Sequence, residues 1–264
     1  MERHPYLGNH RILALAHRGG TVRHPENTMA AFQYAVDLGY RYLETDVHAS
    51  ADGQLYAFHD DNLERVVGRR AFIHDLSSRD LDRLEFGDGH RIPRLEELFI
   101  TWPEVHLNID PKADASVIPL VEAIRRHEAI DRVCVGSFSD RRIAYCRNEL
   151  GPELCTSLAP VDIFRIILRS RGVPTRDLPA PLAQVPMRQR LGGPLSIPVI
   201  TPEFVDKAHE LGIDVHVWTI DDPPTIARLV ELGVDGIMTD RPDVLRSELL
   251  DHGCWEAPYD RDRA

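Results

Sequence analysis

Two acids stand within an apolar run in the stretch RYLETDVHASADGQLYAFHD, residues 41–60. Alternate side chains of a strand share one face, so Glu44 and Asp46 point to the same side. Two carboxylates this close repel each other inside a protein unless a positive charge compensates them. The pattern leaves three interpretations open: a solvated edge strand, ion pairs with Arg18 and Lys112, or a bound metal ion.

A third acid extends this cluster, because Asp110 ends another apolar run in the motif NIDPK. Glu44, Asp46 and Asp110 together offer carboxylate oxygens to one divalent cation, Ca²⁺ or Mg²⁺, both of which prefer oxygen ligands. Arg18 and Lys112 are suited to hold an anionic group beside that metal, Arg through its planar fork and Lys as a point charge. We therefore expect a small anionic substrate and one metal ion.

Two histidines flank the acids in the sequence, His17 in the motif HRG and His59 in the motif HD. An unperturbed imidazole titrates near neutral pH, so one ring can accept a proton while the other donates one. Metal, cations and paired histidines suit phosphoryl transfer, which needs neutralised charge and moving protons. The residues alone predict metal-dependent hydrolysis of a phosphoester.

The composition of the chain bounds its class. With 264 residues, of which 43% are hydrophobic, the chain fits one domain of the size of an α/β barrel. The formal net charge of -11 argues against binding nucleic acid or anionic lipid through the overall field. Attraction of an anionic substrate must then be local.

The cysteines and apolar runs indicate a compartment. The four cysteines have no CxxC spacing and nothing at the N-terminus has the order of a signal peptide, so we expect free thiols. The longest apolar runs fall well short of the ~20 residues that cross a bilayer. We therefore predict a cytoplasmic protein with no stable membrane anchor.

Apolar stretches alternate with amphipathic ones along the chain, which is the pattern of a parallel sheet closed by crossover helices. We predict an α/β fold, a single TIM-type (β/α)8 barrel. The carboxyl ends of its strands form the rim that carries active sites, so the polar residues at those ends are expected to converge. The predicted strands are Ile12–Ala16, Arg41–Val47, Val105–Ile109, Arg132–Gly136, Leu154–Leu158, Leu182–Val185, Ile213–Trp218 and Gly236–Met238. The predicted helices are Thr28–Leu38, Ala115–His127, Asp140–Glu149, Pro202–Leu211 and Pro223–Leu232.

Two segments interrupt this alternation. Residues 48–98 hold an extra short strand, Gln54–Phe58, and then a loop excursion with a helical turn on each side. Residues 170–200 are rich in Pro, Gly and Arg and are expected to form a long surface loop around the sixth strand. We expect one domain over 1–264, with its core at about 12–250 and a loosely ordered polar tail at 251–264.

The ordered set of motifs resembles the glycerophosphodiester phosphodiesterase family. Each piece is weak alone, but together they span residues 12 to 245 in the order expected of that family. The pieces are AHRGG and PENTMAAF within 16–32, LETDVHASADGQLYAFHD at 43–60, RIPRLEELF at 91–99, LNIDPK at 107–112, VWTIDD at 217–222 and GVDGIMTDRPD at 233–243.

The resemblance implies an α/β barrel that hydrolyses glycerophosphodiesters, such as glycerophosphocholine or glycerophosphoethanolamine, to glycerol 3-phosphate and an alcohol. It also implies a role for each matching residue. These are His17 and His59 as the catalytic pair, Glu44, Asp46 and Asp110 as metal ligands, Arg18 and Lys112 as phosphate contacts, and Trp218 as an aromatic of the pocket.

One motif departs from the family pattern, which more often has Glu-x-Lys where this chain has Asp110-Pro111-Lys112. Asp is one methylene shorter than Glu, so the ion would sit closer to the third strand or bind through a water, and the metal preference could differ. Pro111 lacks an N–H group and should therefore lie where the ladder of the sheet ends.

Two other functions remain open. A lysophospholipase D or a sphingomyelinase-D-like phosphodiesterase shares the acids and histidines but takes a lipid, for which Ile163–Leu168 is either an apolar lip or a helix packed on the barrel. A non-catalytic barrel is disfavoured because both histidines and all three acids are present. The sequence leaves the headgroup, the metal, the direction of proton transfer and the oligomeric state open.

Overall fold

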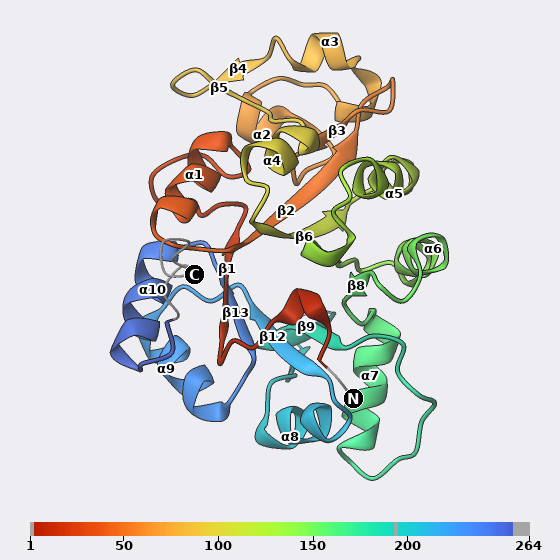
Figure 1. Cartoon of the computed structure of the whole chain (residues 1–264), viewed down its shortest axis with the longest axis vertical. Coiled ribbons are helices and arrows are strands. Elements are labelled where there is room, and N and C mark those ends of the chain that lie inside the picture. Colours follow the sequence, from red (N-terminus) through yellow and green to blue (C-terminus); the bar gives the residue numbers. More distant parts are fainter. Residues whose placement is uncertain (1–2, 193–194, 256–264) are drawn as a thin grey trace.

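The computed structural model describes residues 3–192 and 195–255 and places eight parallel strands in one barrel ringed by helices (Figure 1). The strands are β1 (Leu13–His17), β2 (Tyr42–Ala49), β6 (His106–Pro111), β7 (Val133–Val135), β8 (Cys155–Thr156), β9 (Leu182–Pro186), β12 (Asp214–Trp218) and β13 (Gly236–Thr239). They are joined in the order β8-β7-β6-β2-β1-β13-β12-β9. One parallel bridge, between Ser157 and Leu182, links the two ends and nearly closes the barrel. The predicted barrel is confirmed.

Helices cover the outside of the barrel and bury its larger core. Leu43 and Val47 of β2 face this outer core, while Glu44 and Asp46 face the barrel interior, as the alternation of the strand predicts. The helices are α1 (Met29–Asp37), α5 (Val117–Arg126), α6 (Asp140–Leu150), α7 (Pro160–Arg169), α8 (Pro202–Glu210), α9 (Pro223–Leu232) and α10 (Pro242–Asp251). Short 3₁₀ turns are η3 (Asp114–Ser116) and η4 (Ile130–Arg132).

The bottom of the barrel is filled by a second core and closed by the N-terminal segment. The 3₁₀ helix η1 (Pro5–Leu7) inserts Tyr6 and Leu7, which are fully buried against inward side chains of the strands. Arg3 fixes this segment, because its Nε lies 3.0 Å from Asp214 Oδ2. The inward partners are Leu13, Leu15, Tyr42, Cys134, Cys155, Leu182 and Met238.

The excursion after β2 is confirmed, and it is more regular than predicted. The extra strand β3 (Leu55–Ala57) pairs antiparallel with β2, and the segment has a small core of its own. In Figure 1 this segment lies at the top, beyond β2. Its other elements are α2 (Glu64–Val67), η2 (Ile73–Asp75), α3 (Ser78–Leu81), the hairpin of β4 (Glu85–Phe86) and β5 (His90–Arg91), and α4 (Leu95–Thr101).

The expectation of a structureless loop at 170–200 is wrong in part. After β9 the chain forms an antiparallel hairpin of β10 (Arg188–Gly192) and β11 (Leu195–Pro198), whose register shifts between residues 190 and 192. Helix α10 was not predicted, whereas α7 corresponds to the helix interpretation of Ile163–Leu168. Most of the polar tail, residues 256–264, lies outside the described residues. Within the described part of the chain, no helix has both the length and the apolar character to cross a membrane.

Candidate active site

The three acids lie together at the carboxyl-end rim of the barrel. Glu44 and Asp46 are 5% and 1% exposed, and both line a cavity of about 550 Å³ that opens at this rim. Asp110 of β6 is the direct register partner of Asp46 and lines the same cavity. The convergence expected from the barrel rule is therefore found, and it includes every residue that the sequence singled out for the site.

Two cations neutralise Asp46. Arg18 Nε lies 2.9 Å from Asp46 Oδ2, and Lys112 Nζ lies 2.7 Å from Asp46 Oδ1. Burial disfavours the charge of Asp46, but these two cations outweigh burial and lower its pKa. The ion-pair interpretation of the acids therefore holds for Asp46 in this structure.

Among the described side chains, no Arg or Lys forms an ion pair with Glu44, whose charged neighbours include Asp46 and His17. Its Oε2 accepts the Arg18 backbone N–H at 3.1 Å and lies 3.7 Å from His17 Nε2. Burial and then the neighbouring Asp46 raise the pKa of Glu44 to about 7. Glu44 therefore changes charge near neutral pH.

Lys112 bridges the second and third acids. Its Nζ lies 2.8 Å from Asp110 Oδ2 in addition to its contact with Asp46. Burial raises the pKa of Asp110, although Lys112 opposes this rise. Arg142 of α6 fixes the backbone here, donating to the carbonyl oxygens of Pro111 at 3.1 Å and Lys112 at 2.7 Å. Pro111 is the last residue of β6, as expected for a residue without an N–H group.

His17 is oriented by a carboxylate to which the sequence analysis gave no role. Its Nδ1 lies 2.6 Å from Asp240 Oδ1, just after β13, and its Nε2 points toward Glu44. Burial alone would lower the pKa of His17, but Glu44 and Asp240 outweigh burial and raise it. The Nε2 atom is left as the proton-transferring position of the ring.

His59 also has a carboxylate on Nδ1. Its Nδ1 lies 2.7 Å from Asp60 Oδ1, and its own carbonyl oxygen accepts the Nε2–H of buried His48 at 3.1 Å. Arg65 of α2 holds Asp60, with Nε 2.6 Å from Oδ2. The Arg65 hydrogen bonds lower the pKa of Asp60 to about 2, so this carboxylate stays charged.

A chain of ion pairs joins this histidine to the anion-binding side of the site. Arg65 grips Glu26 with Nη1 at 2.9 Å and Nη2 at 2.7 Å, and Glu26 Oε1 also accepts Arg18 Nη1 at 2.9 Å. Arg18 adopts a left-handed backbone conformation, with φ of 54°, that is uncommon outside glycine. Asp60 is thereby connected to Asp46 through three side chains. These are Arg65, Glu26 and Arg18.

The donor chemistry of the acids fits a divalent cation, although their arrangement here does not enclose one. Three carboxylates face two cations, Arg18 and Lys112, and burial, with a smaller effect of Asp46, raises the pKa values of Glu44 and Asp110. Over residues 3–192 and 195–255, no three His, Cys, Asp or Glu side chains group closely enough to hold a metal ion. The ammonium of Lys112 takes the space between two of the acids.

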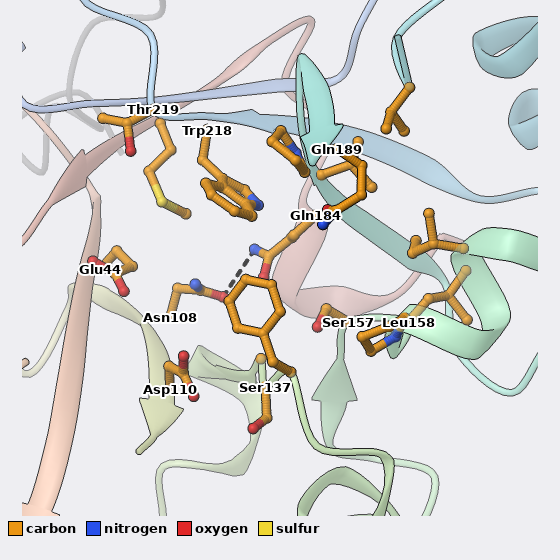
Figure 2. Close-up of a pocket in the computed structure, with 18 of the residues that line it drawn as sticks. Glu44, Asn108, Asp110, Ser137, Ser157, Leu158, Gln184, Gln189, Trp218 and Thr219 are labelled. Atoms are coloured by element: carbon orange, nitrogen blue, oxygen red, sulfur yellow. Dashed lines mark hydrogen bonds between the residues drawn. The ribbon is translucent and has the colours of Figure 1, made fainter. Parts of the chain in front are cut away.

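The far side of the cavity is apolar. Residues 160, 163, 164 and 167 of α7 recur at helical spacing and line it, and Phe164 is 55% exposed. The predicted pocket aromatic Trp218 lines the cavity as well and packs edge-on against Phe138, with ring centroids 5.7 Å apart. Figure 2 shows this indole above the polar side chains of the floor. The stretch Ile163–Leu168 is thus a helix on the barrel and also an apolar wall.

Several site residues were missed in the sequence because nothing local marks their role. Glu26 and Arg65 are 39 residues apart and meet only because the excursion folds back. The positions of Asp60 and Asp240 could have indicated their roles from the sequence. Asp60 adjoins His59, and Asp240 directly follows β13.

Comparison with known proteins places this chain in a family. Residues 17–244 match the Glycerophosphoryl diester phosphodiesterase family. The "Probable glycerophosphodiester phosphodiesterase 2" of Mycobacterium tuberculosis is 39% identical over 249 residues, covering 92% of this chain and 93% of that protein. The human "Lysophospholipase D GDPD1" is 28% identical, covering 89% of this chain and 85% of that protein.

A solved structure has the same fold. The Oleispira antarctica phosphodiesterase in complex with the product sn-glycerol-3-phosphate superposes with a TM-score of 0.75, covering 90% of this chain and 96% of that chain at 22% identity. The family match spans most of the chain and agrees with the barrel and its rim. The chain therefore belongs to the glycerophosphoryl diester phosphodiesterase family of enzymes.

Proposed function

We propose that this enzyme hydrolyses glycerophosphodiesters to glycerol 3-phosphate and an alcohol, using one divalent cation and two histidines. The observation that carries the proposal is the pair of histidines, each bound to a carboxylate through Nδ1, in the same cavity as Arg18 and Lys112. This arrangement leaves two Nε2 atoms for proton transfer and two cations for the phosphate.

The proposed reaction moves one proton at each histidine. His17 accepts the proton of the attacking water as the new P–O bond forms, since Glu44 and Asp240 stabilise its imidazolium. His59 donates a proton to the departing alkoxide as the old P–O bond breaks. Arg18 and Lys112 hold the non-bridging oxygens, whose charge grows in the transition state.

Glu44, Asp46 and Asp110 are the residues that would hold Ca²⁺ or Mg²⁺, which would supply further charge neutralisation at the phosphate. Their oxygen-only donor set supports this. Equilibrium dialysis should detect one bound ion per chain, and Glu44→Gln should weaken binding, whereas Glu122→Gln on the outside of α5 should not. Full activity in protein exhaustively treated with chelator would contradict the metal requirement.

The substrate is tested with a panel. We expect release of glycerol 3-phosphate from glycerophosphocholine or glycerophosphoethanolamine in the presence of added metal. The substrate is a small molecule, the net charge of -11 disfavours nucleic acid, and the free, buried cysteines suit the cytoplasm. No release from any member of the panel, with Ca²⁺ or Mg²⁺ present, would contradict the proposal.

A lipid substrate is a second candidate, favoured by the apolar wall of α7. Ile163, Phe164 and Ile167 face the cavity rather than the outer core alone, and such a surface suits an acyl chain. A lysophospholipase D or sphingomyelinase-D-like enzyme would cleave lysophosphatidylcholine faster than glycerophosphocholine. Phe164→Asp should then reduce only the activity on the lipid. Equal loss on both substrates would argue against acyl binding at this wall.

A further inference from the structure

Two neutral amides bridge the floor of the cavity. Gln184 of β9 donates from Nε2 to Asn108 Oδ1 of β6 at 3.0 Å, and Figure 2 shows this bond crossing beneath Trp218. The two strands are not neighbours in the barrel, since β7 and β8 lie between them. Gly136, which directly follows β7, makes room for the bridge, because a Cβ there would lie 3.0 Å from Gln184 Oε1.

The bridge uses few of the hydrogen-bonding atoms of its members. An amide pair has four N–H donors and two carbonyl oxygens, and one bond between them uses one of each. Among the described residues, neither the Asn108 Nδ2 nor the Gln184 Oε1 atom makes another hydrogen bond that we identify. Both side chains line the cavity, as does the nearby hydroxyl of Ser157. Polar atoms at the bottom of a cavity with no protein partner point to a polar ligand.

The position of the amides matches one end of a substrate held at the rim. Asn108 is the register partner of Glu44 and precedes Asp110 by two residues on the same face of β6. Two residues of a strand span about 6–7 Å, so the amides lie one short molecular fragment below the phosphate-binding cations. A three-carbon polyol attached to the phosphate is long enough to cover that depth.

We propose that the Asn108 and Gln184 side chains form a hydroxyl-binding subsite that selects the glyceryl end of the substrate. This inference rests on the proposed hydrolysis of glycerophosphodiesters. The subsite is built from neutral donors and acceptors, which match a hydroxyl and offer neither a cation for the phosphate nor an anion for an ammonium headgroup. The alcohol released by hydrolysis therefore lies toward the rim, and the glycerol moiety lies on the floor.

Substrates that differ only in hydroxyls test the subsite. Glycerophosphocholine is compared with propyl phosphocholine, which has the same charge and carbon chain without the two hydroxyls. Neutral hydrogen bonds are worth roughly a 10-fold preference each, so the wild-type enzyme should prefer glycerophosphocholine by about 10- to 100-fold in kcat/KM. Gln184→Met keeps the length of the side chain and removes its amide, so this preference should fall to within a few-fold of one.

The control variants separate binding from folding. Activity of Gln184→Met and Asn108→Leu on propyl phosphocholine should stay within a few-fold of wild type, and Ser137→Ala, elsewhere on the cavity wall, should keep the full preference. An unchanged preference in the two amide variants would overturn the inference. Equal loss on both substrates would do so as well, because it would indicate a purely structural bridge.

A binding measurement distinguishes this inference from the proposed function. If the wild-type enzyme cleaves neither diester, the proposed hydrolysis fails. Calorimetry then compares sn-glycerol 3-phosphate with propyl phosphate. Tighter binding of the glycerol compound that is lost in Gln184→Met supports the subsite without turnover, and equal binding of the two compounds contradicts it.

Discussion

Both histidines of the rim carry a carboxylate on the same ring nitrogen. Asp240 contacts His17 Nδ1 from the end of β13, and Asp60 contacts His59 Nδ1 from the adjacent residue in the chain. A carboxylate in this position fixes the ring and stabilises its protonated form. The two rings are nevertheless supported differently, because Glu44 lies beside His17 while Arg65 balances Asp60.

Removing either histidine tests the assignment of acid and base. Positioned proton transfer contributes ~10²–10⁴-fold, so His17→Ala and His59→Ala should each lower kcat by about that factor while the fold survives. A p-nitrophenyl phosphodiester has a leaving group that hardly needs a proton. His59→Ala should therefore be nearly as active as wild type on it, whereas His17→Ala should not.

Circular dichroism and metal binding serve as controls for these two variants. Equal losses of kcat on the activated and natural substrates in both variants would contradict the assignment of His59 as acid and His17 as base. Losses of no more than a few-fold in both variants would place the active site elsewhere.

At the scale of elements, helix α2 of the excursion after β2 contributes to the site through one side chain. Arg65 of α2 is half exposed, yet it contacts Glu26 and Asp60, each through two nitrogens. Exposed ion pairs contribute little on their own, but paired forks restrict geometry more than a single contact. The short helix therefore acts as a clamp between His59 and the loop that follows β1.

Substituting Arg65→Met should loosen this clamp. We expect kcat/KM to fall ~3–10-fold at low salt, and the difference from wild type to shrink at high salt because salt screens exposed pairs. Arg70→Met is the matched control, since Arg70 is more exposed and pairs with Glu64 alone. A similar loss in both variants would indicate a general effect of charge on the excursion.

The elements differ in how far the sequence predicts them. All eight barrel strands were recognisable because buried parallel strands are apolar runs bounded by polar residues. Of the two interpretations of Ile163–Leu168, the helix is found, and its residues that face the cavity also form the apolar wall. The hairpin of β10 and β11 has no alternating pattern that would mark it in the sequence.

The candidate site was predictable where chemistry sits at strand ends and unpredictable where it depends on tertiary contacts. His17, Glu44 and Asp110 follow from the barrel rule. The amide bridge of Asn108 and Gln184 does not, because it crosses 76 residues of sequence and two intervening strands. Neither residue type is unusual in its own strand.

At the scale of the whole molecule, the barrel interior encloses a neutral imidazole. His216 of β12 is fully buried beside Gly236, where a Cβ would lie 2.5 Å from the ring. Neither ring nitrogen has a hydrogen-bond partner among the described residues. Burial, with a smaller effect of Arg3, lowers the pKa of His216 to about 3.

This histidine should make the fold sensitive to acid. Its pKa is lower in the folded than in the unfolded state, so the unfolded chain binds more protons and stability falls as pH drops from about 6.5 toward 3. His216→Leu removes this loss, and at pH 4.5 the variant should retain about 2–3 kcal/mol more of its neutral-pH stability than wild type does.

Urea unfolding at pH 7.5 and 4.5 measures the difference. His74→Leu is the control, since His74 is exposed on the excursion and its loss should leave the pH dependence unchanged. If His216→Leu and wild type lose the same free energy of unfolding between pH 7.5 and 4.5, other groups govern acid unfolding.

The N-terminal segment at the bottom of the barrel controls how fast two buried cysteines react with a thiol reagent. Cys134 and Cys155 are neighbours on β7 and β8, fully buried in the core that Tyr6 and Leu7 complete. A thiol reagent can reach them only after that core opens, so the rate of labelling reports how often the lid of Tyr6 and Leu7 lifts. Arg3→Ala, which removes the tether to Asp214, should quicken labelling while the rim, at the opposite end of the barrel, continues to work.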